Sequence, residues 1–156
     1  MLKPSQLAPN FTVLNEADKP ISLADFRGKQ KVVLYFYPKD DTPGCTIEAN
    51  QFTALVDEFA KADTTVIGIS MDTCESHRQF IGKYGLRVML LSDSEGKVSR
   101  EYGVWQEKEK EGVKKMGIVR STFIIDKAGT LVDVQYGVNP DGHALQVLEK
   151  VRQLKG

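Results

Sequence analysis

Cysteine and histidine are scarce in this sequence, with two of each among 156 residues. Two cysteines are too few for the disulfide framework of a small secreted domain, and with two histidines they match no zinc-site spacing. The spacing of His77 and His143 demands no chemistry, and we expect both at the surface. Charge of one sign is also lacking, because 21 basic residues balance 21 acidic ones. We therefore expect neither nucleic acid nor membrane partners.

Long apolar segments are lacking as well. The first residues contain no apolar run of the signal-peptide kind, and no window approaches the roughly 18 apolar residues of a membrane span. We therefore expect a soluble protein of the cytoplasm. The length is close to one domain of about 150 residues, and no repeat or linker interrupts it. A single domain over residues 1–156 is expected.

The hydrophobic pattern indicates an α/β fold. Runs rich in β-branched and aromatic residues predict strands at 32–37, 65–69, 88–91, 122–125 and 131–134. Helical spacing of apolar residues separates the first three runs, which predicts parallel strands joined by covering helices. Turn residues join the last two runs as an antiparallel hairpin. The central sheet is therefore expected to be mixed and flanked by helices.

Three further segments complete the expected fold. Residues 11–14 and 21–23 are typical of a small N-terminal β-hairpin. Asp141 is a candidate N-cap for a closing amphipathic helix. The charged run 107–112 is expected to be a solvated loop without a binding role.

The densest chemistry lies directly after the first strand of the predicted sheet. Reactive groups collect at the carboxyl ends of parallel strands, where loops vary without disturbing the core. There Thr42 is a plausible N-cap, Pro43 suits the first helical position, and Cys45 stands at the third. A helix N-terminus favours the thiolate form of cysteine, which is the form that attacks a peroxide oxygen. This spacing predicts an exposed, ionised and redox-active thiol at Cys45.

The pattern Pro38-x-x-x-Thr42-x-x-Cys45 resembles the peroxidatic signature of the peroxiredoxins. Pro-Gly-Cys-Thr followed by Glu-Ala is similar to the PrxQ or bacterioferritin-comigratory subfamily, and the similarity covers about residues 4–154. The resemblance implies a thioredoxin-like fold with an N-terminal β-hairpin extension. It also implies reduction of hydrogen peroxide and organic hydroperoxides without a metal, flavin or other cofactor.

The resemblance further implies a role for each matching residue. Cys45 is similar to the cysteine that attacks the peroxide and becomes a sulfenic acid, and Thr42 to the residue whose hydroxyl orients the peroxide. Pro38 is similar to the residue that shields the thiol. Arg120 is similar to the cation that holds the thiolate and polarises the O–O bond. Glu48 lies one helical turn beyond Cys45, where it either hydrogen-bonds Arg120 or is an ordinary exposed glutamate.

The chain departs from the subfamily in its second cysteine. Many relatives carry a resolving cysteine five residues after the attacking one, and this chain has Asn50 there. Cys74 follows the second predicted strand of the sheet and is expected at the same sheet edge as Cys45. Two alternatives stay open: Cys74 resolves the sulfenic acid through a Cys45–Cys74 disulfide, or an external thiol does.

The leading hypothesis is a thiol-dependent peroxidase, a monomer or weak dimer, that is recycled by thioredoxin, glutaredoxin or a small thiol. A general thiol–disulfide oxidoreductase is the first alternative, and the absence of a C-x-x-C motif weakens it. The second alternative is a non-enzymatic redox sensor that uses sulfenate formation as a switch.

Overall fold

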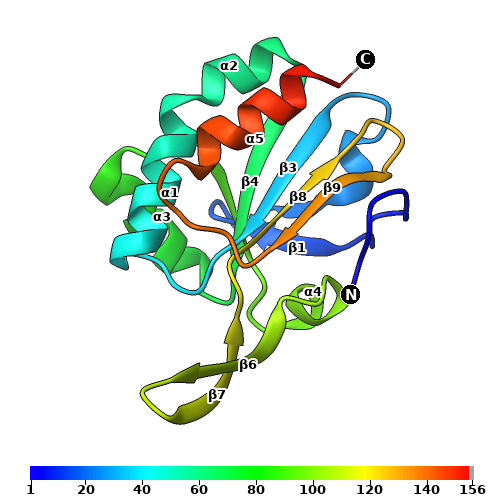
Figure 1. The fold of residues 1–156 in the computed structure, drawn as a ribbon. Coiled ribbons are helices and arrows are strands. Elements are labelled where there is room, and N and C mark those ends of the chain that lie inside the picture. The colour runs from blue at the N-terminus through cyan, green and yellow to red at the C-terminus, as the bar shows by residue number, and fades with distance from the viewer. Residues whose placement is uncertain (155–156) are drawn as a thin grey trace.

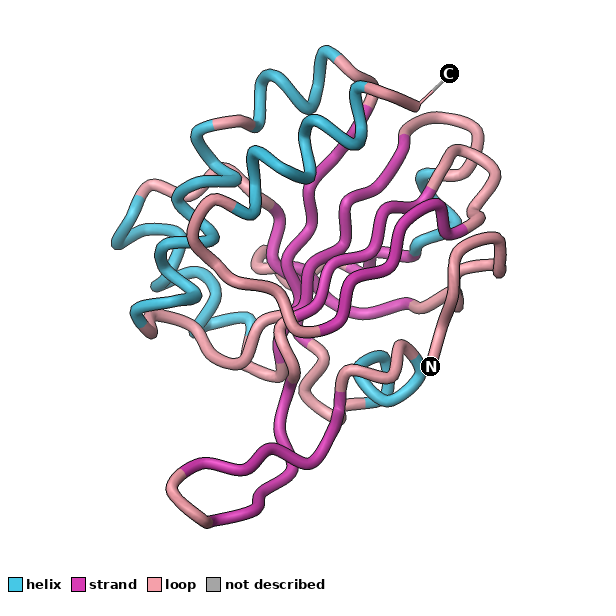
Figure 2. The backbone as a smooth tube through the Cα atoms, viewed as in Figure 1, coloured by secondary structure: helices cyan, strands magenta, loops and turns pink. Residues whose placement is uncertain are grey.

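A seven-stranded mixed sheet forms the centre of the structure, a computed structural model that describes residues 1–154. Figures 1 and 2 show its strands side by side. Strands β3, β4 and β5 run parallel, and the strands outside them are antiparallel to their neighbours. The mixed sheet and its N-terminal hairpin confirm the predicted fold class. In spatial order the strands are β2 (Pro20–Ser22), β1 (Thr12–Asn15), β5 (Met89–Ser92), β4 (Thr64–Ser70), β3 (Lys31–Phe36), β8 (Ser121–Ile125) and β9 (Leu131–Tyr136).

Helices cover both faces of this sheet (Figure 1). Residues of four helices share one hydrophobic core, and residues of a short 3-10 helix and a short α-helix share the other. Within residues 1–154, no helix combines the length and the apolar character needed to cross a membrane. The first core contains α1 (Pro43–Ala54), α2 (Val56–Lys61), α3 (Cys74–Tyr84) and α5 (His143–Arg152), and the second contains η1 (Leu23–Phe26) and α4 (Lys97–Glu101).

Strand β3 is buried on both faces and carries the site at its carboxyl end. Val33 and Tyr35 belong to one core, whereas Leu34 and Phe36 belong to the other. This alternation follows from the two-residue repeat of a strand. Full burial of one such side chain contributes about 1.5–3 kcal/mol. The strand is therefore a rigid support for the loop that follows it.

The charged run predicted as a loop is instead part of a two-stranded hairpin. Strands β6 (Trp105–Lys110) and β7 (Val113–Ile118) pair antiparallel and project from the body of the molecule (Figures 1 and 2). Glu111 and Gly112 form the turn, with φ of 54° and 79°. Two positive φ values are typical of the type I′ turn that suits a two-residue hairpin. Because most of both faces contacts solvent, the strands lack the apolar alternation by which strands are recognised.

The start of the closing helix also differs from the prediction. Gly142, with φ of 80°, is the N-cap of α5, while the Asp141 carboxylate accepts a hydrogen bond from Gln51 Nε2 at 2.7 Å. His143 therefore lies in the first turn, where it is buried against the sheet and its Nε2 is 2.8 Å from Thr122 Oγ1. Burial, reinforced by Lys150, lowers the pKa of His143 to about 4. The expected surface position of His143 was wrong.

Candidate active site

The register of the sheet brings Cys45 and Arg120 to the same edge. Strand β8 is antiparallel to β3, with Ser121 paired to Phe36 at the carboxyl end of β3. Arg120 immediately precedes β8, and α1 begins a few residues after β3. Two residues 75 positions apart are thereby placed side by side, and Arg120 Nη2 lies 3.4 Å from Cys45 Sγ.

The first turn of α1 has the predicted arrangement. Thr42 is the N-cap, Pro43 occupies the first helical position and Cys45 the third. The Thr42 hydroxyl does not cap the helix, because it donates to the Lys39 carbonyl oxygen at 2.8 Å. The first N–H groups of a helix have no intrahelical acceptor. Cys45 therefore stands where unpaired backbone donors favour negative charge.

Cys45 is buried rather than exposed, with 1% of its surface accessible. It packs with Tyr35, Ala49 and Phe52 in the core between α1 and the sheet. The prediction of an exposed thiol was wrong because the third position of α1 faces this core. The Arg120 side chain contacts the buried thiol and is itself 14% exposed, so it reaches from the sulfur toward the surface.

Arg120 also binds Glu48, which settles the alternative left open for that residue. Arg120 Nη1 donates to Glu48 Oε1 at 2.8 Å, and Glu48 is fully buried rather than exposed. Burial raises the pKa of Glu48 to about 7, although Arg120 acts in the opposite direction. Burial disfavours the Arg120 cation, but Glu48 and Cys45 outweigh this and raise the Arg120 pKa. Arg120 is thus a permanent cation whose Nη1 donates to the Glu48 carboxyl and whose Nη2 contacts the Cys45 thiol.

There is little free space between Gly44 and the Arg120 guanidinium. A Cβ on Gly44 would lie 3.1 Å from Arg120 Nη2 and 3.4 Å from Pro140 Cγ. Any other residue at position 44 would therefore press on the group that contacts the thiol.

Within residues 1–154, the buried Glu48 Oε2 and Tyr35 hydroxyl have no hydrogen-bond partner. The pattern of residue types gave no signal for either buried atom.

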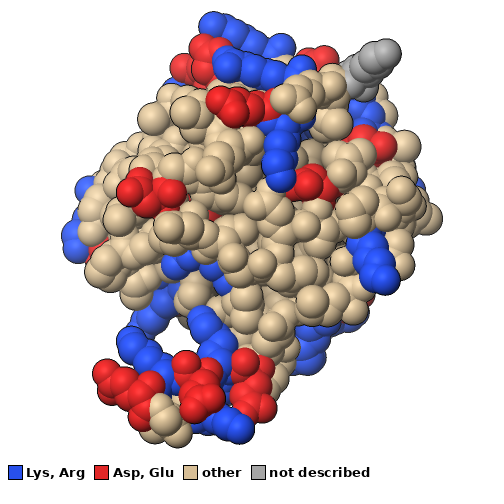
Figure 3. Space-filling view, in the orientation of Figure 1, with Lys and Arg blue, Asp and Glu red and all other residues tan. Residues whose placement is uncertain are grey.

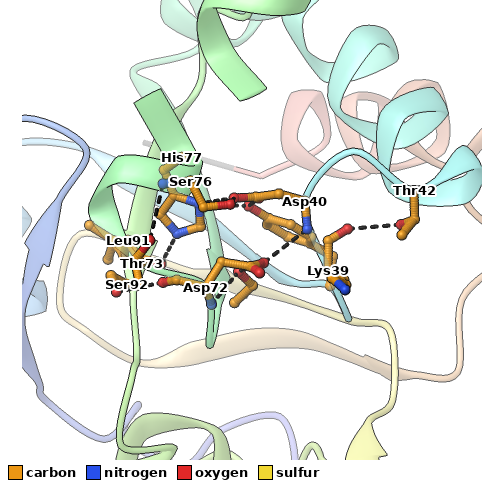
Figure 4. Close-up of polar contacts among 11 residues, drawn as sticks. Lys39, Asp40, Thr42, Asp72, Thr73, Ser76, His77, Leu91 and Ser92 are labelled. Carbon is orange, nitrogen blue, oxygen red and sulfur yellow. Dashed lines mark hydrogen bonds and ion pairs between the residues drawn. The ribbon is translucent and has the colours of Figure 1, made fainter. Parts of the chain in front are cut away.

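A buried polar network holds the loop between β3 and α1 (Figure 4). The Asp40 carboxylate accepts hydrogen bonds from the Tyr37 hydroxyl and from Ser76 Oγ, and it lies 2.7 Å from His77 Nδ1. His77 Nε2 is 2.9 Å from the Leu91 carbonyl oxygen. His77 is fully buried, so its expected surface position was wrong. The network ties the loop that carries Pro38 and Thr42 to α3 and β5.

Asp72 joins the same network from the end of β4. Its Oδ2 accepts from the Asp40 backbone N–H at 2.9 Å and from Ser70 Oγ at 2.7 Å. The ligand-type atoms of Asp40, Asp72 and His77 all lie within 4.8 Å of one another, as in a metal site. Protein donors already engage both Asp40 oxygens and Asp72 Oδ2, so we interpret the cluster as a tether for the loop.

Cys74 lies in a different environment at the start of α3. It is the first residue of the helix, and Thr73 is the N-cap, accepting from the Ser76 N–H at 3.1 Å. Partial burial and the Asp18 carboxylate raise the pKa of the Cys74 thiol. Both cysteines are free thiols. A cavity of about 620 Å³ between β1, α3 and α4 is lined by Cys74, and Cys45 is not among its lining residues.

Comparisons with known proteins agree with this arrangement. Residues 4–134 match the AhpC/TSA family. The chain is 47% identical over 150 residues to a putative peroxiredoxin Bcp of Helicobacter pylori strain J99, covering 96% of this chain and 98% of that one.

Two solved structures have the same fold. A cysteine-to-serine mutant of PrxQ from Xylella fastidiosa superposes with a TM-score of 0.91 at 33% identity, covering 97% and 96% of the two chains. The bacterioferritin comigratory protein of Xanthomonas campestris superposes with a TM-score of 0.86 at 35% identity, covering 91% and 90%. The chain belongs to the AhpC/TSA family, as a thioredoxin-like peroxiredoxin of the Bcp and PrxQ group.

Proposed function

We propose that Cys45 is the residue with which this thiol peroxidase reduces peroxides. The observation that carries the proposal is the contact of Arg120 Nη2 with Cys45 Sγ, at the N-terminus of a helix. The Cys45 thiolate attacks one peroxide oxygen, so that an S–O bond forms and the O–O bond breaks. The thiolate becomes a sulfenic acid, and the leaving alkoxide or hydroxide takes up a proton to give an alcohol or water.

Arg120 and Thr42 would act on the peroxide during this step. Negative charge moves from sulfur to the leaving oxygen, and a fixed cation beside both atoms lowers the energy of that charge. The Thr42 hydroxyl hydrogen is engaged by Lys39, so its oxygen lone pairs are available to accept from the peroxide O–H. Pro38 is half-buried in the same loop, and we assign it the role of restricting water around the thiol.

The sulfenic acid must then be reduced by a thiol. We propose a reductant of the thioredoxin type, acting on a single domain over residues 1–156 that works as a monomer or weak dimer. Such reductants keep cysteines reduced in the cytoplasm, which is the compartment we expect. Substrates would include alkyl hydroperoxides, since the Xanthomonas campestris relative is described by its alkyl peroxide reduction activity.

The experiment is to measure peroxide consumption coupled to thioredoxin and its reductase. Cys45→Ser should abolish turnover with the fold intact, because Cys45 contacts the Arg120 guanidinium, whereas the Asp18 carboxylate raises the pKa of Cys74. Cys74→Ser is the matched control, with the same change of atom at the other helix start, and should keep the first step. Appreciable turnover by Cys45→Ser would overturn the assignment.

Whether Cys74 resolves the sulfenic acid requires a separate measurement. A disulfide between Cys45 and Cys74 needs Cα atoms within about 7 Å, and because Cys45 is buried we expect the first turn of α1 to open when it forms. Non-reducing peptide mapping after one equivalent of peroxide decides between the alternatives. A linked pair of peptides supports an internal disulfide. Oxidised Cys45 beside free Cys74 supports an external thiol.

A further inference from the structure

Arg120 contacts two acidic groups, and each of them contacts a different nitrogen of the guanidinium. Nη1 donates to Glu48 Oε1 at 2.8 Å, and Nη2 lies 3.4 Å from Cys45 Sγ. The guanidinium carries one positive charge, whereas a carboxylate and a thiolate together carry two negative charges. Glu48 is fully buried, so solvent screens a surplus charge there only weakly. The site therefore favours one negative charge between Cys45 and Glu48.

The contacts of Glu48 show which of its oxygens holds a proton. Oε1 accepts the hydrogen bond from Arg120, and within residues 1–154 the buried Oε2 has no hydrogen-bond partner. A buried charged oxygen without a partner is more costly than the neutral O–H of a carboxylic acid. Burial accordingly raises the pKa of Glu48 to about 7. Beside a Cys45 thiolate, Glu48 is thus a neutral acid with its proton on Oε2.

Groups on three other elements act electrostatically on this site. Tyr35 of β3 interacts with Glu48, and it stays neutral because burial raises its pKa. His143 of α5 interacts with Arg120 and is also neutral, since burial lowers its pKa to about 4. Lys108 of β6 interacts with Arg120, and its ammonium donates to a backbone carbonyl at 2.7 Å. Figure 3 shows Lys and Arg side chains, in blue, around the hollow between the β6–β7 hairpin and the body of the protein. Among these groups, Glu48 is the one that loses a proton near neutral pH.

We propose that Glu48 holds, on Oε2, the proton that peroxide reduction consumes, and that it loses this proton as Cys45 is oxidised. This inference rests on Cys45 being the peroxide-reducing thiol. The thiolate attacks one peroxide oxygen, the O–O bond breaks, and two electrons pass from sulfur to the peroxide. The leaving oxygen takes up one proton to become water or an alcohol, and the Glu48 carboxyl becomes a carboxylate. The proton balance is the same whether the proton passes directly or through water.

The oxidation of Cys45 itself causes Glu48 to lose its proton. A sulfenic acid is neutral, so oxidation removes the negative charge at sulfur and leaves the Arg120 cation in place. Losing a nearby like charge and keeping the opposite one favours the carboxylate form of Glu48. Arg120 then has one anionic partner before and after the reaction, first Cys45 and then Glu48. A buried cation without a counter-charge, which is strongly destabilising, is avoided at both stages.

The first measurement is an infrared difference spectrum between the reduced chain and the chain treated with one equivalent of hydrogen peroxide. Cys74→Ser serves as the background, so that the sulfenic acid on Cys45 cannot form an internal disulfide. At about pH 6, where Glu48 holds its proton in the reduced chain, oxidation should remove the C=O band of a protonated carboxyl and produce a carboxylate band. Glu48→Gln in the same background should show neither change, because glutamine keeps an oxygen acceptor for Arg120 but cannot hold the proton.

The second measurement follows proton uptake from a weakly buffered solution with an indicator dye, under the same conditions. The chain with Glu48 should take up about one proton fewer per sulfenic acid formed than Glu48→Gln does. The matched control is Glu75→Gln, which removes an exposed carboxyl in the first turn of α3, the helix of the other cysteine. It should give the same uptake as the chain with both glutamates.

A difference spectrum without loss of the protonated carboxyl band overturns the inference. So does the same loss in Glu48→Gln, which would assign the band to another carboxyl, or equal proton uptake by the two chains. These results leave the proposed function standing when Cys45 forms a sulfenic acid. If hydrogen peroxide does not oxidise Cys45, the proposed function itself is wrong.

Discussion

Cys45 stands in the first turn of α1 after β3, and Cys74 stands in the first turn of α3 after the neighbouring parallel strand β4. The backbone thus offers both thiols a helix N-terminus. Their side-chain neighbours differ in sign: Cys45 contacts the Arg120 guanidinium, whereas Cys74 lies beside the Asp18 carboxylate. Their burial differs too, since Cys45 is enclosed in the core and Cys74 borders an open cavity.

The comparison shows that a helix N-terminus does not by itself select the reactive cysteine. A helix end contributes about 0.3–1 kcal/mol to a charge beside it, and this is available at both positions. The selection must come from the residues that the sheet brings to each thiol. For Cys45 these are Arg120, which the β3–β8 register places beside it, and Glu48, which accepts a hydrogen bond from Arg120 Nη1.

The largest expected effect follows from removing the cation at Cys45. Arg120→Met should slow Cys45 oxidation at least tenfold, which corresponds to about 1.4 kcal/mol of transition-state stabilisation. Stopped-flow measurement of the first oxidation step gives the rate directly. Arg78→Met is the matched control, because Arg78 is the cation near Cys74, and it should leave the Cys45 rate unchanged. Equal rates in the Arg120 variant and the wild type would remove Arg120 from the site.

A second effect, on stability rather than on rate, is expected from the carboxyl that holds Arg120. The Glu48 pKa rises from 4.5 to about 7 in the native state, so between these values the native protein keeps a proton that the unfolded chain has lost. The free energy of unfolding should therefore fall as pH rises from about 4.5 to 7, with a contribution of up to about 1.4 kcal/mol per pH unit. Glu48→Gln should remove this contribution.

Urea titrations of the wild type and Glu48→Gln at several pH values measure the difference between them. Other groups that titrate in this range, including His143, cancel in that difference. Two parallel pH profiles would mean that Glu48 does not hold a proton in the native state.

The smallest effect is expected at the other cysteine. Asp18→Asn removes the carboxylate that raises the Cys74 pKa, so a larger fraction of Cys74 becomes thiolate. Alkylation of Cys74 by iodoacetamide near pH 8 should speed up about twofold to fivefold. The alkylation rate of Cys45 in the same sample is the internal control and should not change. An unchanged Cys74 rate would show that Asp18 does not set its reactivity.

Much of the fold was predictable because the buried strands carry strong periodic signals. Strands β3, β4 and β8 are continuous apolar runs, as expected for strands covered on both faces. The β6–β7 hairpin was missed because its strands carry little apolar alternation, although Glu111-Gly112 was an available turn signal. The helix positions of Thr42, Pro43 and Cys45 followed from capping rules and were confirmed.

The surroundings of the site were harder to predict because they depend on tertiary packing. The burial of Cys45 and the contact between Glu48 and Arg120 arise where α1 packs on the sheet, and no local pattern encodes them. The burial of His77 did have a signal, since it shares a helical face with Phe80 and Tyr84. Its partner Asp40 lies in a loop, where spacing carries no information about contacts.

The most direct test of the account is to oxidise each cysteine in the absence of the other. Cys74→Ser and Cys45→Ser are treated with one equivalent of hydrogen peroxide, quenched with a sulfenic-acid trapping reagent and mapped by mass spectrometry. The account predicts rapid trapping at Cys45 in the first variant and little at Cys74 in the second, because Cys45 contacts the Arg120 guanidinium and the Asp18 carboxylate raises the Cys74 pKa. Equal trapping at the two cysteines, or faster trapping at Cys74, would contradict it.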